Sequence, residues 1–368
     1  MLAYLVVLGG SLCLSLILTP LSIYLARRLG IVAKPGGRRQ HKGLVPKLGG
    51  VVILGAFAGG ALLSLAVRGW LPPPPEGPDP KEMGRFAAVL AGAALIGLFG
   101  LVDDRHELGS RPQYLAQVVV TVVAIAGQVF VERVGNPFTG GITVFPWPMI
   151  WGFTLLWLMG MMNTVNFMDG LDGLAAGVGV IVSIVLLVHM LRVGQYGPAL
   201  LPVALLGTLL GFLPFNFYPA RIHMGSGAIT LGFLIGTLSL VAGARVATVT
   251  LVMGIPIVDV AWQILYRWRH GRSMNEGDRG HLHFRLQDLG LAQSKVVLGY
   301  WFFCALLGAL TFVVSSRLYK ALAILALGAS VMGVLAWLSR RAEKVGLETG
   351  QNTEPEAEPS DDGTRSTH

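Results

Sequence analysis

Long apolar runs, separated by short polar stretches, make up most of this chain. Eleven runs are long enough, or nearly so, to cross a bilayer as helices, because about 20 apolar residues span its hydrocarbon core. They cover residues 2–26, 48–67, 86–102, 114–131, 149–165, 171–191, 199–215, 228–242, 247–265, 296–314 and 318–338. We therefore expect an all-α polytopic membrane protein with about eleven transmembrane helices.

Composition and charge agree with this prediction. The chain has 53% hydrophobic and 13% charged residues, which is too apolar for a soluble globular protein. Cys13 and Cys304 lie inside apolar runs, so neither a disulfide framework nor a zinc site is expected. The net charge of +8 requires no nucleic-acid partner, because membrane proteins carry an excess of Lys and Arg in their loops on one side.

The positions of Lys and Arg predict the orientation. No basic residue precedes the first run, and Arg27 and Arg28 follow it, which indicates a retained helix with an outside N-terminus. Loops 27–47, 103–112, 166–170, 216–227 and 266–295, together with the tail from 339, then share one side. They hold 20 of the 28 Lys and Arg residues, so we expect this side to be cytoplasmic.

Three other segments carry no predicted chemistry. Residues 71–80 form a proline-rich spacer, and residues 136–148, with two central glycines, predict a small hairpin on the outer surface. Residues 342–368 are acidic and polar, which predicts a disordered cytoplasmic tail. The expected organisation is a membrane domain over residues 1–341 followed by this tail.

Asp169 and Asp172 are the only acidic residues between positions 133 and 258, and a glycine follows each. One interpretation is a polar turn between two helices, in which an Asp caps the second helix. The other is a site at the membrane face, where these carboxylates and the amides of Asn163 and Asn166 converge on a metal ion and a phosphate.

Two further segments on the same side carry charges. Residues 34–50 are basic and glycine-rich, which suits either a loop that sets the topology or a loop that approaches a ligand. Asp103, Asp104 and Glu107 end the third predicted helix, with Asp103 and Glu107 on one face. Such carboxylates are either solvated at the helix end or offset by a cation or a proton.

Two more loops complete the set. Gly225, Ser226 and Gly227 open the eighth predicted helix and would direct backbone N–H groups toward an anion. The alternating side chains of His281, His283 and Arg285 suit phosphate or sugar binding, although histidines in a basic loop are often only surface residues.

Topology brings these segments to one side and predicts a composite site at the inner membrane surface. A basic rim around acidic residues suits a phosphorylated soluble donor and a lipid acceptor, with Mg²⁺ between them. A transporter is another class of membrane protein with about this many helices. The chain has no internal repeat, and apart from Asp259 its acidic residues lie at helix ends, so transport is not favoured.

Five motifs on this side together resemble the polyprenyl-phosphate N-acetylhexosamine-1-phosphate transferases of glycosyltransferase family 4. They read H-K-G-x-x-P-K-L-G-G (41–50), D-D-x-x-E (103–107), N-x-x-N-F-x-D-G-L-D-G-L-A-A-G (163–177), N-F-x-P-A-R-I-x-M-G (216–225) and G-H-L-H-x-R-L (280–286). The last motif is more similar to the undecaprenyl-phosphate GlcNAc-1-phosphate branch, which starts surface glycans, than to the branch that makes the first peptidoglycan lipid.

The resemblance implies a reaction and a location. A sugar 1-phosphate, expected to be N-acetylglucosamine 1-phosphate, would pass from a UDP-N-acetylhexosamine to undecaprenyl phosphate with release of UMP. This would be the first membrane step of cell-wall or surface-glycan synthesis in a multi-pass protein of the bacterial cell membrane, with its active face cytoplasmic. The cofactor would be Mg²⁺, with Mn²⁺ as an alternative, and a homodimer is compatible with the family.

The resemblance also implies roles for single residues. Asp103 and Asp104 would deprotonate or position the lipid phosphate, Asn166 would be a metal ligand, and Asp169 would be an essential acid at the metal. The substrate-binding residues would be Asp172 and Asn216 around uridine and, at the donor diphosphate, Lys47, His281, His283 and Arg285.

The chain departs from the family pattern at five places. The family usually reads M-G-D-S-G where this chain has Met224 followed by Gly225-Ser226-Gly227, so the metal-binding Asp is missing. The other departures are Ala33 and Glu107 in place of Asp, His223 in place of an aromatic residue, and Phe284 in place of a histidine. Two hypotheses follow. Either Asp169 or Asp104 reaches the metal and a transferase remains, or the chain is a catalytically silent relative that binds a lipid phosphate or nucleotide sugar as a partner or regulator.

Overall fold

The computed structural model describes residues 1–33, 44–131, 133–135, 141–243, 245–271, 280–314 and 316–345. Most of the predicted basic loop (34–43) and of the predicted tail (346–368) lie outside these residues. The last described helix continues to Val345, past the predicted start of the tail at 342.

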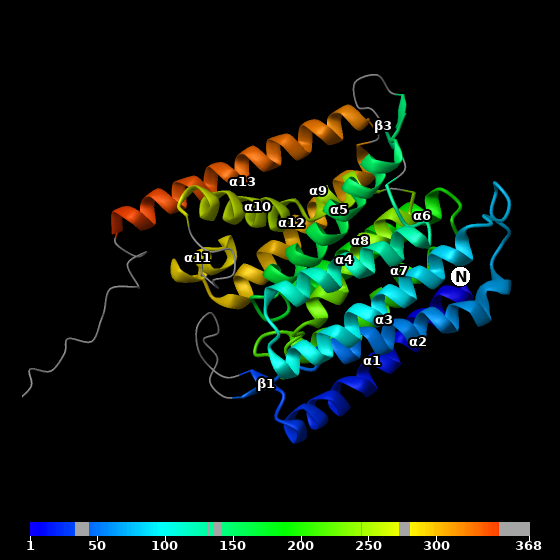
Figure 1. Cartoon of the computed structure of the whole chain (residues 1–368), viewed down its shortest axis with the longest axis horizontal. Coiled ribbons are helices and arrows are strands. Elements are labelled where there is room, and N and C mark those ends of the chain that lie inside the picture. Colours follow the sequence, from blue (N-terminus) through cyan, green and yellow to red (C-terminus); the bar gives the residue numbers. More distant parts are fainter. Residues whose placement is uncertain are drawn as a thin grey trace, which may run out of the picture.

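Elongated helices lie side by side and form one bundle (Figure 1). Each of the eleven apolar runs contains helix, with boundaries shifted by a few residues. The ten unbroken helices are α1 (Leu2–Leu29), α2 (Gly49–Val67), α3 (Glu82–His106), α4 (Ser110–Ala126), α5 (Trp147–Met168), α6 (Leu174–Arg192), α7 (Leu200–Asn216), α8 (Gly227–Val241), α12 (Gln293–Val313) and α13 (Arg317–Val345).

Helix length and hydropathy support a multi-pass membrane protein. Six of the described helices are long and apolar enough to cross a membrane, or seven if one bent pair counts as a single span. Helices α7 and α8 are apolar but shorter. The membrane class is therefore confirmed, and the number of eleven crossings stays a prediction.

The ninth predicted span is broken, which the apolar pattern does not indicate. It consists of α9 (Val246–Val252) and α10 (Gly254–Arg269), which meet at an angle of 83°. At the break, a Cβ atom on Gly254 would lie 2.3 Å from Cδ2 of Leu327 in α13. Pro256 follows in the first turn of α10, where its missing N–H costs no helical hydrogen bond. The break therefore lets α13 pack closely against α10.

Helix α8 lies at the centre of the bundle, because every residue from Gly227 to Val241 is buried. A helix that is apolar on all faces requires neighbours on all sides. Glycines provide room for them: a Cβ atom on Gly232 would lie 2.6 Å from the carbonyl oxygen of Met161 in α5. Close backbone approach at small residues is typical of helix packing in membranes. The start of α8 is consequently held in a fixed place.

Short elements lie at the two ends of the bundle. One end, called the site end below, holds the antiparallel pair β1 (Val32–Ala33) and β2 (Val45–Pro46) and the short helix α11 (Leu282–Asp288). The opposite end holds the 3-10 turn Arg68–Trp70 and the hairpin of β3 (Arg133–Gly135) and β4 (Ile142–Val144). The expected hairpin is confirmed, although its first strand begins before residue 136, and its place on the outer surface stays a prediction.

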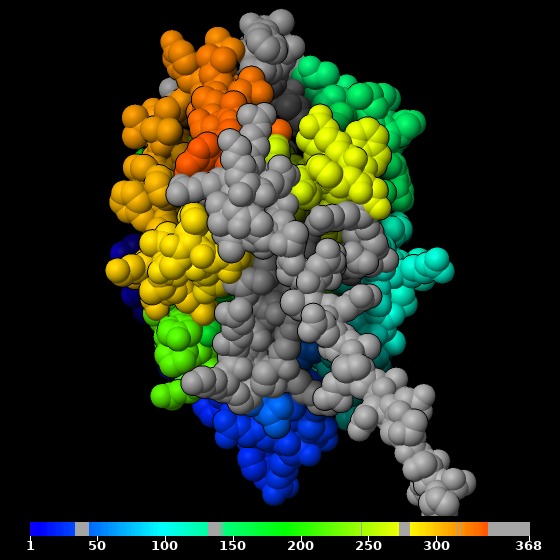
Figure 2. Space-filling view, turned by 90° about the vertical axis from the view of Figure 1, so that its left-hand side faces the viewer, coloured from blue at the N-terminus to red at the C-terminus, as the bar shows by residue number. Residues whose placement is uncertain are grey.

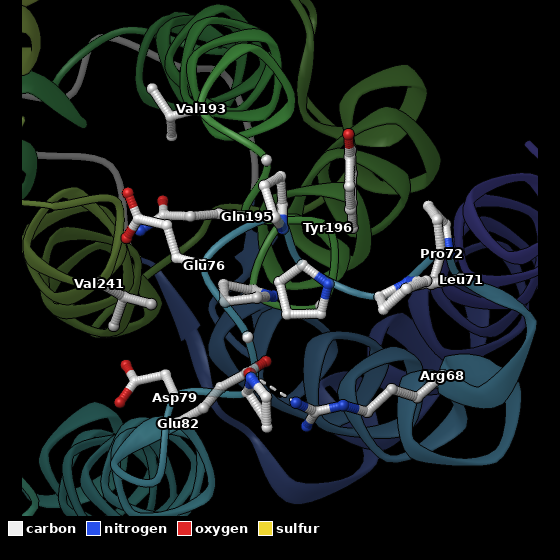
Figure 3. Close-up of a pocket in the computed structure, with 18 of the residues that line it drawn as sticks. Arg68, Leu71, Pro72, Glu76, Asp79, Glu82, Val193, Gln195, Tyr196 and Val241 are labelled. Atoms are coloured by element: carbon white, nitrogen blue, oxygen red, sulfur yellow. Dashed lines mark ion pairs between the residues drawn. The ribbon is translucent and has the colours of Figure 1, made fainter.

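The proline-rich segment closes over the opposite end. Residues 72–80 and 194–198 line a cavity of about 800 Å³ there (Figure 3). Four of its charged side chains form the ion pairs Arg68–Glu82, at 2.5 Å, and Arg85–Asp79, at 2.9 Å. This cavity is therefore remote from the carboxylates and histidines of the predicted site.

Candidate active site at one end of the bundle

The turn before α8 binds the carboxylate pair at the end of α3. The backbone N–H of Ser226 donates to Oδ1 of Asp104 at 2.9 Å. The Ser226 hydroxyl lies 3.1 Å from both Oδ1 of Asp104 and Oδ2 of Asp103. Hydrogen bonds to charged groups are the stronger ones, at about 1.5–3 kcal/mol each. Ser226, which is buried, thus fixes two adjacent carboxylates relative to the start of the central helix.

This turn has no room for a longer side chain. Gly225 has a φ angle of +61°, and a Cβ atom on it would lie 2.6 Å from the carbonyl oxygen of Lys47 and 2.7 Å from Oδ1 of Asp104. A Cβ atom on Gly100 would lie 2.9 Å from Cβ of Ser226. Both glycines are required for the close contact between α3 and the turn.

The prediction that the backbone N–H groups of this turn bind an anion from a ligand is wrong for the groups described here. The N–H of Ser226 is bonded to Asp104, and those of Gly227 and Ala228 donate to the carbonyl oxygens of Met224 and Gly225. These backbone groups therefore bind the protein itself. Of the three, only the N–H of Ser226 contacts an anion, which is the Asp104 carboxylate.

Glu107 does not share a helical face with Asp103, contrary to the spacing argument. Helix α3 ends at His106, and Glu107 has a left-handed backbone with φ of +50°. Oδ1 of Asp103 instead accepts the N–H of Leu108 at 3.0 Å. The Glu107 side chain is 81% exposed, and Nζ of Lys47 lies 3.4 Å from its Oε1. Lys47 thus lies on the Asp103–Asp104 side of the site.

The polar-turn interpretation of Asp169 and Asp172 is right about the turn, which joins α5 to α6, and wrong about the Asp cap. Gly173, not an Asp, is the N-cap of α6, and no side chain caps it. Asp169 lies at the C-terminus of α5, one turn after Asn166. Oδ2 of Asp172 accepts the N–H of Ala220 at 3.1 Å, so Asp172 connects this segment to the loop after α7.

That loop carries two more of the residues that the sequence singles out. Nδ1 of His223 lies 3.6 Å from Oδ1 of Asp172. The amide of Asn216, which is buried, donates to the carbonyl oxygen of Ile222 at 3.0 Å, and its Oδ1 has no hydrogen-bond partner among the described residues. A buried acceptor without a partner indicates a place where a donor group from a ligand or water binds. Asp172, His223 and Asn216 thus all contact the loop after α7 or belong to it, and their role at uridine stays a prediction.

Asn163 does not converge with them. Its Nδ2 donates to Oε1 of Gln117 in α4 at 2.8 Å and to the carbonyl oxygen of Met159 at 2.8 Å. This amide pair joins α4 to α5 inside the bundle. Asn163 is therefore a packing residue.

The histidine loop is anchored to a buried carboxylate that the sequence argument left without a role. Oδ2 of Asp259 lies 3.0 Å from Nδ1 of His281, and its Oδ1 accepts the N–H of Leu282 at 2.9 Å. His281, His283 and Asp259 are all buried, and the two imidazole rings stack with centroids 5.5 Å apart. The Asp259 bond fixes the orientation of the His281 ring and turns its Nε2 away from α10.

The histidine loop also packs against the motif that contains Asp169. A Cβ atom on Gly170 would lie 2.7 Å from Nε2 of His283 and from Cζ of Phe284. The ring of Phe167 stacks on His281 with centroids 5.5 Å apart. The motif around Asp169 and the histidines are thus parts of one site. The signal for Asp259 was available in the sequence, since it is the only acid between positions 173 and 275.

Arg285 lies in α11 and is held near the loop that precedes it. Its Nε donates to the carbonyl oxygen of Gly280 at 2.6 Å, and Nε2 of Gln263 in α10 donates to the same oxygen. Viewed end-on, α10 (yellow-green) and α11 (gold) lie on either side of the centre of this face, and α1 (blue) lies at its edge (Figure 2). The site residues themselves come from segments between Lys47 and Arg285.

The oxygen donors of the site suit a metal ion that is held by few protein ligands. Among the described residues, no three His, Cys, Asp or Glu side chains come together as a metal site. Asn166 and Asp169 are half-buried oxygen donors one turn apart, and Asp104 keeps its Oδ2 out of the Ser226 bonds. Mg²⁺ commonly takes one or two carboxylates and completes its shell with substrate phosphates and water. These residues fit that mode of binding and do not form a closed protein cage.

The comparisons with known proteins agree with one another. Residues 86–243 match the model of the family described as glycosyl transferase family 4. A probable undecaprenyl-phosphate N-acetylglucosaminyl 1-phosphate transferase from Bacillus subtilis is 30% identical over 78% of this chain and 78% of its own. A decaprenyl-phosphate N-acetylglucosaminephosphotransferase from Mycobacterium tuberculosis is 33% identical over 74% of this chain and 73% of its own.

A third relative extends the similarity to another branch. A phospho-N-acetylmuramoyl-pentapeptide-transferase from Desulforudis audaxviator is 30% identical over 82% of this chain and 95% of its own. The match to the family model, over residues 86–243, contains the carboxylate pair, the Asp169 motif and the loop after α7. This chain belongs to glycosyl transferase family 4.

Proposed function

We propose that the protein transfers a sugar 1-phosphate from a UDP-N-acetylhexosamine, with N-acetylglucosamine as the expected sugar, to undecaprenyl phosphate. The names of the two relatives that act with N-acetylglucosamine support this reaction class. The observation that carries the proposal is the convergence of the Asp103–Asp104 pair, the Asp172–Asn216 loop and the His281–His283 loop on one end of a membrane bundle.

The reaction displaces one phosphate ester by another. An oxygen of the lipid phosphate attacks the phosphorus that bears the sugar, the bond from that phosphorus to UMP breaks, and UMP leaves with the bonding electrons. Such transfers depend mainly on positioning and on stabilising charge. We assign Asp103 and Asp104 to the lipid phosphate, whose remaining proton they would accept or orient. Ser226 keeps both carboxylates in place.

Cationic and donor groups would hold the nucleotide sugar. We assign His281, His283 and Arg285 to its diphosphate, with Lys47 balancing charge beside Asp104. The unpartnered Oδ1 of Asn216 and the carboxylate of Asp172 suit the imide N–H and ribose hydroxyls of uridine. Asp259 would act through His281 by fixing its ring.

Members of this family generally depend on a divalent cation, and Mg²⁺ is our assignment. Asn166 and Asp169 would hold it, and when bound it would neutralise charge on the phosphates. The Lys and Arg distribution supports an active face in the cytoplasm of a bacterial cell. The glycan that follows would be a cell-wall or surface polymer.

The second candidate function is a catalytically silent relative that binds a lipid phosphate or nucleotide sugar. It is favoured by the Ser226 turn, where hydrogen-bond donors fill one side of the carboxylate pair. Such a protein would be stabilised by UDP-N-acetylglucosamine or by the lipid phosphate without forming product.

Label transfer by purified protein separates the two candidates. With radiolabelled UDP-N-acetylglucosamine, undecaprenyl phosphate and Mg²⁺ or Mn²⁺, we expect lipid-linked product that Asp169→Asn lowers by at least 100-fold. Asp79→Asn, at the opposite end, is the matched control and should retain activity. Stabilisation by the substrates with no product from the native chain would instead establish the silent relative.

A further inference from the structure

Basic side chains gather at the opposite end of the bundle, away from the proposed active site. Arg192 ends α6, Arg245 precedes α9, and Lys320 lies in the first turn of α13. Helix α12 packs against α6 and α9, and α9 packs against α13, so the segments that carry these side chains meet. We call Arg192, Arg245 and Lys320 the basic cluster.

The end of α12 contacts this cluster. Nη1 of Arg192 donates to the carbonyl oxygen of Phe312 at 3.4 Å, and its guanidinium carbon lies 4.8 Å from the centre of the Phe312 ring. The buried imidazole of His189 lies against the same ring at 4.8 Å, and its Nε2 is 3.2 Å from Oγ1 of Thr311. Four segments of the chain therefore converge at one place.

Within the described parts of the chain, no acidic side chain lies within ion-pair distance of the basic cluster. Nε of Arg245 is buried without a hydrogen-bond partner, and burial lowers the pKa of this guanidinium. Arg68 and Arg85, at the same end, are each paired with a carboxylate. Like charges brought together out of water are costly unless an anion joins them.

The surroundings indicate how such an anion is presented. Val193, Val313 and Tyr319 flank the cluster in sequence and are 47%, 79% and 65% exposed. On a membrane protein, large apolar side chains exposed beside cations mark the boundary between acyl chains and headgroups. A lipid headgroup brings a phosphate to this depth together with acyl chains that cover the apolar side chains. A phosphate ion in solution covers none of them.

We propose that the basic cluster is a binding site for the phosphate group of an anionic membrane phospholipid. Long basic side chains also extend toward headgroups without specificity. Nε of Arg245 distinguishes this place from such general contact, because it is a buried donor that no described protein group satisfies. The bound phosphate would offset the repulsion among the three cations and join α6, α9, α12 and α13 at this end.

Thermal unfolding of the full-length protein in a neutral detergent tests the proposal. Phosphatidylglycerol in mixed micelles should raise the melting temperature of the native protein, whereas phosphatidylcholine should not. Lys320→Gln and Arg245→Gln should each raise the half-saturating phosphatidylglycerol concentration at least tenfold. Without anionic lipid, Lys320→Gln should melt no lower than the native protein, because it removes a repelling charge.

Arg68→Gln is the matched control, since it removes a cation at the same end that is paired with Glu82. It should leave the response to phosphatidylglycerol unchanged. Equal responses of the native protein and the cluster variants would mean adventitious binding and would overturn the proposal. Stabilisation by inorganic phosphate but not by phosphatidylglycerol would overturn the assignment to a lipid.

Discussion

At the scale of single residues, Ser226 has the most specific geometry in the proposed site. Its backbone N–H and its hydroxyl contact both carboxylates at the end of α3. The sequence marks Asp103, Asp104 and the glycines as unusual. It does not indicate that the serine between the glycines bonds the carboxylates, because that contact joins residues 122 and 123 positions apart.

Ser226→Ala should lower turnover about tenfold or more. The variant keeps the backbone N–H bond to Asp104 but loses the hydroxyl that lies between the two carboxylates, and a bond to a charged group is worth about 1.5–3 kcal/mol. Turnover should fall more than KM for either substrate rises, since Ser226 acts through the carboxylates. Ser64→Ala, which removes a buried hydroxyl bonded only within α2, should keep full activity. Equal losses in both variants would contradict a positioning role.

Asp259→Asn should lower activity about 10- to 100-fold, as removal of a group that orients a binding side chain commonly does. The amide still accepts the N–H of Leu282 through one oxygen, but it presents an NH₂ or a neutral oxygen to His281. The affinity for UDP-N-acetylglucosamine should fall, and equilibrium binding of the nucleotide sugar measures it. An unchanged affinity for UDP-N-acetylglucosamine would mean that Asp259 does not contribute to binding of the donor.

At the scale of elements, apolar runs predicted the helices well because burial in lipid or in the bundle constrains every residue of a span. They did not predict the bend of 83° between α9 and α10, which depends on how Leu327 of α13 meets Gly254. Helical spacing also gave a wrong position for Glu107, because the helix stops one residue earlier and Glu107 adopts a left-handed backbone. Errors of this kind arise at helix ends, where contacts distant in sequence decide the geometry.

The turn before α8 provides a test at this scale. Gly225→Ala should lower the melting temperature and abolish most transferase activity, because a left-handed residue with a Cβ atom costs about 1–2 kcal/mol and the new atom overlaps Lys47 and Asp104. Gly30→Ala is the matched control. Gly30 has a φ of +69°, but a Cβ atom on it would meet nothing within 4 Å, so this variant has the backbone strain alone. A loss no larger than that of Gly30→Ala would show that the close contact is unimportant.

At the scale of the whole molecule, the bundle places a buried central helix so that the turn before it meets α2 and the end of α3, which are far away in sequence. The composite site could be predicted from the side on which the polar loops lie. The role of each residue within the site could not be predicted from the sequence. Those roles depend on two contacts, between Asn163 and Gln117 and between Asp259 and His281, that join distant residues. For the opposite end, the sequence analysis predicted a proline-rich spacer and a hairpin, and neither the ion pairs nor the basic cluster.

The central claim is that this bundle catalyses sugar-1-phosphate transfer with the Ser226 turn as it stands. The most direct measurement is radiolabel transfer from UDP-N-acetylglucosamine to undecaprenyl phosphate, with Mg²⁺ or Mn²⁺, by the native chain and by a variant with an Asp inserted between Gly225 and Ser226. We predict metal-dependent product from the native chain and less from the insertion variant, because the inserted residue displaces Ser226 from the carboxylates. Product from the insertion variant alone, with none from the native chain, would contradict the account and identify a silenced relative.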